Sequence, residues 1–95
     1  MSDRVVWKYG LEAGYQDVLV PPGAEVLGVH EQRGSVCLWA LVDPRQRPME
    51  ARRFLVVPTG VGLCVGSGDR FLGSVFLRGG DVVLHVFEVR EGEKR

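Results

Sequence analysis

The stretch Gly34-Ser-Val-Cys-Leu-Trp-Ala-Leu-Val-Asp43 decides how this chain folds. A Gly-Ser turn signal opens it, a proline follows it, and the residues from Val36 to Val42 are apolar without interruption. On a β-strand, successive side chains point to opposite faces, so Leu38 and Trp39 face opposite ways. Both faces of this strand are apolar, and both have to be covered. The stretch therefore predicts a central strand around which the other strands are arranged.

Further short runs along the chain are alternating or fully apolar, which predicts strands, and we find no helical period with caps. Arg33-Gly34 forms a hairpin signal, so the strand before it and the central strand are expected to be antiparallel neighbours. Strict alternation in that preceding strand puts Val26 and Val29 on opposite faces. Gly73 lies inside a strand and indicates a bulge or a close backbone approach. Turns are expected at 10–14 and 78–81, and strands at 4–9, 16–20, 24–32, 36–42, 50–57, 70–77 and 82–89.

About seven short strands are typical of an all-β fold, here a small antiparallel sandwich or a partly closed barrel. The last strand is apolar on both faces like the central one, so either the sheet closes on itself or another copy of the chain covers one face. We expect a single domain over 1–90 and a charged, disordered tail over 91–95. Replacing Trp39 by alanine is expected to cost about 3–5 kcal/mol. The residues predicted for the core or a subunit interface are Trp7, Trp39, Leu41, Phe54, Phe76, His85 and Phe87.

The composition excludes several classes of protein. Twelve basic and twelve acidic residues leave no net charge, which argues against a non-specific nucleic-acid binder. No apolar run approaches the roughly 20 residues that span a bilayer, and the N-terminus lacks an apolar signal core, so we expect a cytoplasmic protein without membrane contact. Cys37 and Cys64 lack CxxC spacing, and in a reducing compartment both are expected to be free and buried rather than bridged.

Two groups of residues could bind a ligand. Gly60 and Gly62 belong to the Gly-rich segment 58–68, whose spacing fits neither a dinucleotide fingerprint nor a P-loop. The segment is either a flexible connection or a nest of backbone N–H groups for an anion. Arginine suits bidentate contact with phosphate or carboxylate, so the arginines of the middle strands either converge on such a ligand or form a solvated rim balanced by nearby acids. The arginines predicted as ligand contacts are Arg52, Arg53 and Arg70.

Metal and catalytic chemistry find little support in the sequence. The histidines and cysteines show no close ligand pair, so we expect no metal and no cofactor. Cys64, His85 and Glu88 are conceivable members of a nucleophilic triad, but neither Cys64 nor Ser67 lies in a nucleophile motif. We expect His85 to be a core or interface histidine bonded to a neighbour, and the protein not to be an enzyme.

Several short motifs are spread along the chain: Trp7-Lys-Tyr9, Pro22-Gly-Ala24, Cys37-Leu-Trp-Ala-Leu-Val-Asp43, Thr59-Gly60, Phe71-Leu-Gly73 and His85-Val-Phe-Glu88. With these motifs the chain resembles a family of small uncharacterised phage and prophage proteins, and the Cys37–Asp43 run is the most specific of them. Family members often carry a histidine soon after the Thr-Gly pair, where this chain has Val61. The resemblance implies a phage or prophage origin, a place in the host cytoplasm and no assigned enzyme activity.

Two functions fit these observations. The first is a non-enzymatic phage accessory protein that self-associates and binds a host or phage protein, as the two-faced apolar strands favour. The second is an oligomeric sponge that sequesters nucleotide signals of host defence. Its contacts at subunit boundaries would be Arg52, Arg53, Arg70, Gly60 and Gly62.

Overall fold

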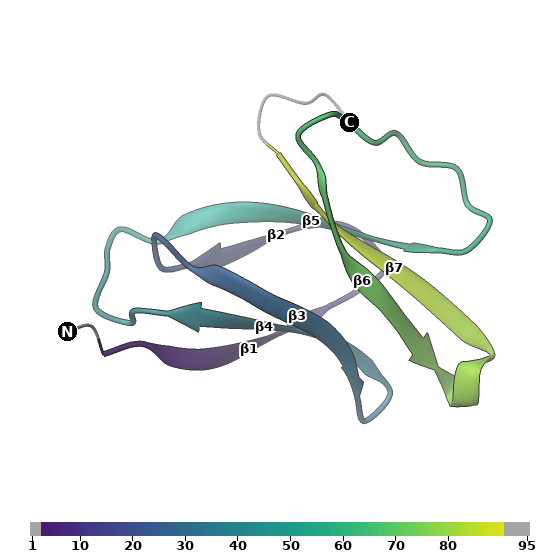
Figure 1. Ribbon diagram of the computed structural model, residues 1–95, viewed down its shortest axis with the longest axis horizontal. Helices are drawn as coiled ribbons and strands as arrows, with labels where there is room; N and C mark the ends of the chain where they lie inside the picture. The colour runs from purple at the N-terminus through teal and green to yellow at the C-terminus, as the bar shows by residue number, and fades with distance from the viewer. Residues whose placement is uncertain (1–2, 91–95) are drawn as a thin grey trace.

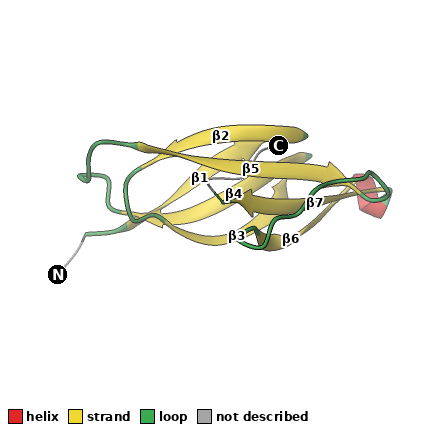
Figure 2. Cartoon of the chain, turned by 90° about the horizontal axis from the view of Figure 1, so that it is seen from above, coloured by secondary structure: helices red, strands yellow, loops and turns green. Residues whose placement is uncertain are grey.

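Seven β-strands build the fold in the computed structural model, which describes residues 3–90. They form sheet A, in the order β1-β4-β3, and sheet B, in the order β2-β5-β7-β6, with antiparallel pairing throughout. The sheets pack together without closing into a barrel, so the all-β prediction is confirmed in its sandwich form (Figures 1 and 2). The tail predicted for 91–95 lies outside the described residues. The strands are β1 (Val5–Leu11), β2 (Gly14–Val20), β3 (Glu25–Gln32), β4 (Ser35–Val42), β5 (Glu50–Pro58), β6 (Arg70–Leu77) and β7 (Val82–Val89).

Strand β4 occupies the middle of sheet A, as its two apolar faces predict. It pairs with β1 on one side and with β3 on the other. Its inward side chains are at most 3% exposed and share one core cluster with Phe54 and Val86 of sheet B. Its outward side chains Trp39 and Leu41 stay partly exposed. One chain therefore covers one face of β4 fully, whereas on the other face Cys37 is buried and Trp39 and Leu41 stay partly exposed.

The hairpins lie where the turn residues predict them. Arg33 and Gly34 both have positive φ, 52° and 82°, as a two-residue hairpin between β3 and β4 requires. The predicted turn at 78–81 is a single 3-10 turn, red in Figure 2, in which the Asp81 N–H donates to the Arg78 carbonyl at 3.2 Å. Local turn chemistry thus fixes both connections.

Two details of the first strands differ from the predictions. The turn between β1 and β2 is shorter than the predicted 10–14, because the Gln16 side chain binds the backbone N–H and C=O of Glu12 at 2.7 and 2.5 Å and closes it early. In β3 the register shifts after Val26, so that Leu27 is an additional residue. Val26 and Val29, predicted on opposite faces, therefore both pack in the core.

The edges of the two sheets meet at β3 and β6, which lie side by side in Figure 1. The register of β6 shifts between Phe71 and Gly73, which confirms the bulge that the glycine predicts. Gly73 has a φ of 153°, and a Cβ added there would lie 3.0 Å from Cγ2 of Val29. The glycine thus permits the close approach of β6 to β3.

The Gly-rich segment connects two strands that run in the same direction. Both β5 and β6 pair antiparallel with β7, so they are parallel to each other, and the connection 59–69 has to cross β7. Sheet A occupies the inner face of sheet B, and in Figure 1 the connection swings out beside β7 on the side away from sheet A. A second, smaller apolar cluster lies on this outer face: Leu55, Val57 and Val89, which are 6–7% exposed, with Phe87 packed against them.

The aromatic residues predicted for the core or an interface occupy different environments. Phe54 is 1% exposed in the main core, and Trp7 packs against that core. Phe87 packs against the second cluster. Phe76 is 62% exposed, because β6 is an edge strand whose outward side chains receive little cover. Phe76 therefore does not belong to the core of one chain, and its place at an interface stays a prediction.

The cysteines are both free, as expected. Cys37 is buried on β4, but Cys64 is exposed. The expectation of a buried thiol is wrong for Cys64, because the connection that carries it runs over the surface.

Candidate functional site

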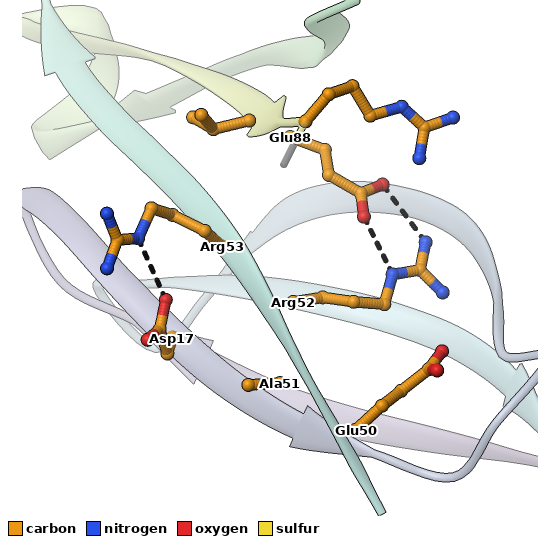
Figure 3. A pocket seen from close by; sticks show the side chains of 8 residues that line it. Asp17, Glu50, Ala51, Arg52, Arg53 and Glu88 are labelled. Atoms are coloured by element: carbon orange, nitrogen blue, oxygen red, sulfur yellow. Dashed lines mark hydrogen bonds and ion pairs between the residues drawn. The ribbon is translucent and has the colours of Figure 1, made fainter. Parts of the chain in front are cut away.

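An open pocket of about 690 Å³ lies at the end of sheet B, where β7 stops and β5 continues (Figure 3). Two of the predicted ligand contacts, Arg52 and Arg53, reach it from β5. Its three arginines and three acidic residues leave it without net charge. The lining residues are Asp17, Glu50, Ala51, Arg52, Arg53, Glu88, Val89 and Arg90.

Arg52 and Glu88 form a buried ion pair beside β5 (Figure 3). Arg52 donates from Nε to Oε2 of Glu88 at 2.7 Å and from Nη2 to Oε1 at 3.0 Å. Its Nη1 donates to the Ala24 carbonyl at 2.6 Å, just before β3, so the guanidinium ties sheet B to the start of sheet A. The Arg52 and Glu88 side chains are 20% and 4% exposed. The hydrogen bonds that Arg52 donates to the Glu88 carboxylate raise the pKa of Arg52.

Arg53 makes a second ion pair on the opposite face of β5, because neighbouring residues of a strand point to opposite faces (Figure 3). Its Nε donates to Oδ1 of Asp17 at 2.9 Å, and this hydrogen bond raises the pKa of Arg53. The two side chains are 48% and 49% exposed. This pair has nearly the length of the Arg52–Glu88 pair but lies in water, where ion pairs contribute little.

The five predicted ligand contacts lie in two groups. Arg70 is opposite Glu88 in the register of β6 and β7, so it belongs to the same end of sheet B as Arg52 and Arg53. Gly60 and Gly62 follow the other end of β5, and the strand between the two groups is roughly 20 Å long. A single chain does not bring the five residues together. One ligand could contact both groups only where two chains meet.

His85 lies on the outer face of sheet B, toward the end of β5 that precedes the glycines. Its Nδ1 is 2.7 Å from Oγ of Ser74, and its Nε2 is 2.6 Å from Oγ1 of Thr59. A neutral imidazole donates from one nitrogen and accepts at the other, so the two hydroxyls satisfy the ring completely. The ring is bonded to its neighbours, as predicted. Glu88 points to the opposite face toward Arg52, so the conceivable triad of Cys64, His85 and Glu88 is not assembled.

The outer side of β6 exposes two aromatic side chains. Phe71 is 56% exposed, and its ring centre lies 5.3 Å from that of Phe87. Phe76 is 62% exposed on the same side of the strand. The sequence predicts Phe76 for the core or a subunit interface and does not single out Phe71, because it does not show that β6 is an edge strand. The nearby connection adds exposed apolar residues, namely Val61, Leu63 and Val65, which are 40–55% exposed.

The outer face of sheet A is a second partly apolar surface. Lys8 donates from Nζ to Oε1 of Gln32 at 2.5 Å, and the same Nζ lies 5.8 Å from the ring centre of Trp39. Val6 and Leu27 are 54% and 50% exposed on this sheet. This face therefore combines apolar side chains with a held cation, whereas the outer row of β6 carries no charge.

Metal and membrane sites can be judged for residues 3–90. In this range no three His, Cys, Asp or Glu side chains are placed to hold a metal ion. The same residues contain no helix of the length and apolarity needed to cross a membrane.

The fold and these surfaces define a small antiparallel β-sandwich with a charge-balanced pocket at one end of sheet B and exposed aromatic residues on its edge strand. The family model described as "Domain of unknown function (DUF7352)" matches residues 2–95, so the chain belongs to this family. No curated protein and no solved structure matches the chain.

Proposed function

We propose that this protein is a non-enzymatic accessory protein of a phage or prophage that works by self-association and by binding a host or phage protein. One observation carries the proposal. The core between the two sheets is complete, yet large apolar side chains remain exposed on the outer faces of both sheets. Clustered exposed apolar side chains on a small domain mark sites of protein interaction.

The two outer faces suit two different partners. Phe71 and Phe76 on β6 expose aromatic rings, the side-chain type enriched at the centres of protein interfaces. The outer face of sheet A offers Trp39 beside Lys8, with apolar Val6 and Leu27. One face can serve a second copy of the chain while the other stays available for a different protein.

The absence of enzyme activity is part of the proposal and rests on how the reactive groups are used. Both ring nitrogens of His85 contact hydroxyls, so within residues 3–90 no carboxylate orients the ring as in a nucleophilic triad. Arg52, Glu88 and Arg53, the charged residues of the pocket with the shortest contacts, bind to partners within the chain. These groups act as structural contacts.

The phage or prophage origin is supported by the motifs from Trp7-Lys-Tyr9 to His85-Val-Phe-Glu88, and such an origin places the protein in the host cytoplasm. The zero net charge supports protein partners over nucleic acid, because nucleic-acid binding draws on an excess of basic residues.

Two measurements test the proposal. Native mass spectrometry and light scattering of the full chain at micromolar concentration should show a multiple of the chain mass. Affinity capture from phage-infected cells should enrich one protein above the background that an unrelated carrier protein captures. The Trp39→Ala variant should lose this protein. A chain that stays monomeric to about 100 µM, near the weak end of specific protein association, would refute the self-association.

The nucleotide sponge is a second candidate, favoured by the pocket beside Arg52, Arg53 and Arg90. Its volume of about 690 Å³ lies in the usual range for small-molecule sites. Thermal shift with a panel of cyclic and linear nucleotides tests it, because a ligand at 100 times its Kd adds about 2.7 kcal/mol. The Arg90→Ala variant should lose any shift. A panel without a shift would remove this candidate.

A further inference from the structure

We infer that two copies of the chain associate about a two-fold axis through the outer row of β6, with the Ser74 side chains of the two copies facing each other. This inference rests on the proposed self-association and names the surface that carries it. The row consists of Phe71, Ser74 and Phe76, which share the outer side of the strand.

The spacing of the row makes it complementary to itself. The bulge before Gly73 absorbs one residue, so the three side chains lie at equal steps along the strand. The row reads aromatic, hydroxyl, aromatic in both directions. A two-fold axis at its centre therefore brings aromatic rings onto aromatic rings whether the two strands run parallel or antiparallel. The register shows the equal steps, because the partners of Phe71, Ser74 and Phe76 on β7 are Phe87, His85 and Val83.

Charge also favours a second copy over an acidic or basic partner. The row carries no charged side chain, and each of its ends has one arginine and one aspartate, Asp69-Arg70 and Arg78-Asp81. The hydroxyl of Ser74 is already bonded to His85, so the centre of the row can be covered without leaving a buried polar group unsatisfied. A neutral surface with balanced ends meets its own copy without like-charge repulsion.

The exposed area is close to what a stable dimer needs. With exposed fractions of 56% and 62%, Phe71 and Phe76 leave roughly 240 Å² of ring surface uncovered. Val61, Leu63 and Val65 on the adjoining connection add roughly 150 Å². A standard interface buries about 800 Å² per partner, a little over half of it apolar. The total of roughly 400 Å² matches that apolar share.

The exposure of side chains on the outer face of sheet B explains why the contact falls on β6. On β5 and β7, the side chains of Leu55, Val57 and Val89 are almost fully buried on this face. On the edge strand β6, Phe71 and Phe76 stay exposed. A second copy would cover the part of the outer face that the chain leaves open.

Cysteine cross-linking tests the axis directly. In a Cys64→Ser background, Ser74→Cys should form a disulfide-linked dimer under mild oxidation, because the two positions face each other. The matched control is Ser35→Cys in the same background, an exposed serine at the start of β4 that should stay monomeric on a denaturing gel. Cross-linking of both variants at equal rates, or of neither, would overturn the inference.

Aromatic removal gives the second readout. Phe76→Ser deletes two interface anchors per dimer and should raise the dimer Kd at least about 100-fold by analytical ultracentrifugation. Leu27→Ser, at a similarly exposed apolar position on sheet A, should leave the Kd unchanged. Circular dichroism checks that both variants fold. If the wild-type chain is a monomer, the proposed self-association is refuted. If the wild type is a dimer and Phe76→Ser leaves the dimer intact, only the assignment of this surface is refuted.

Discussion

The two ion pairs of sheet B allow the effect of burial on the stability of an ion pair to be measured by matched substitutions. Arg52–Glu88 and Arg53–Asp17 have nearly equal lengths, 2.7 and 2.9 Å, and use neighbouring residues of β5. Glu88 is 4% exposed, whereas Asp17 is 49% exposed. Glu88→Ala leaves the Arg52 guanidinium partly buried, with the Ala24 carbonyl as a hydrogen-bond acceptor and the Glu50 carboxylate as a nearby charge. Removing one member of a buried pair costs about 3–5 kcal/mol, whereas an exposed pair contributes less than about 1 kcal/mol.

Urea and thermal unfolding at pH 7, followed by tryptophan fluorescence at one protein concentration, measure both costs. For a domain of this size each kcal/mol shifts the melting temperature by about 4–8 °C, so Glu88→Ala should melt at least about 12 °C below wild type. Asp17→Ala is the control and should stay within a few degrees. The double variant Arg52→Met with Glu88→Leu should recover most of the loss, because a buried pair can be replaced by apolar residues without penalty. Equal losses for Glu88→Ala and Asp17→Ala would refute the reasoning.

Three further changes have expected outcomes. Tyr9→Phe should stabilise the fold by about 1 kcal/mol, because the Tyr9 hydroxyl is buried without a partner among residues 3–90. Burial also raises the pKa of Tyr9, so the wild type should lose stability relative to Tyr9→Phe as pH rises above about 10. Urea unfolding of both proteins below and above that pH will show the difference. Hydrogen bonds from the Arg45 side chain and backbone lower the pKa of Asp43 to about 2. Asp43→Asn should therefore be less stable than wild type above about pH 4. Urea unfolding at a series of pH values should show this difference in stability vanishing as the pH falls through about 2. Leu38→Ala should cost about 2–5 kcal/mol in the same assay. Trp39→Ala should cost only about 1–2 kcal/mol, less than the cost of about 3–5 kcal/mol expected from the sequence, because its side chain points outward and is partly exposed.

The strands could be predicted because their signals are local. Three such signals are the apolar run of β4, the Arg33-Gly34 hairpin and the interior Gly73. Each favours one backbone conformation, whatever the rest of the chain does. The bulge at Leu27 was not predicted, although Gly28 lies directly beside it, because the packing of Val26 and Val29 into one core decides it. Tertiary packing thus overrode simple alternation at one position in β3.

The candidate site was harder to predict, because sequence spacing does not say which strands form the edges. Arg52 and Arg53 are adjacent in the sequence, yet the strand sends them to opposite faces and to different acids. Gly60 and Gly62 looked close to them but follow the far end of β5. Strand order, which brings Glu88 beside Arg52, depends on long-range pairing that no short motif encodes.

The order of sheet B also bears on where the protein meets its partners. The outward residues of β5 and β7 and those of β6 are similarly apolar in the sequence, but their exposure differs from 6% at Leu55 to 62% at Phe76. The difference follows the strand order, because β5 lies between β2 and β7, whereas β6 is an edge strand that pairs with β7 alone. The side chains that one chain cannot cover are therefore set by topology, and in this protein they are the aromatic residues of β6.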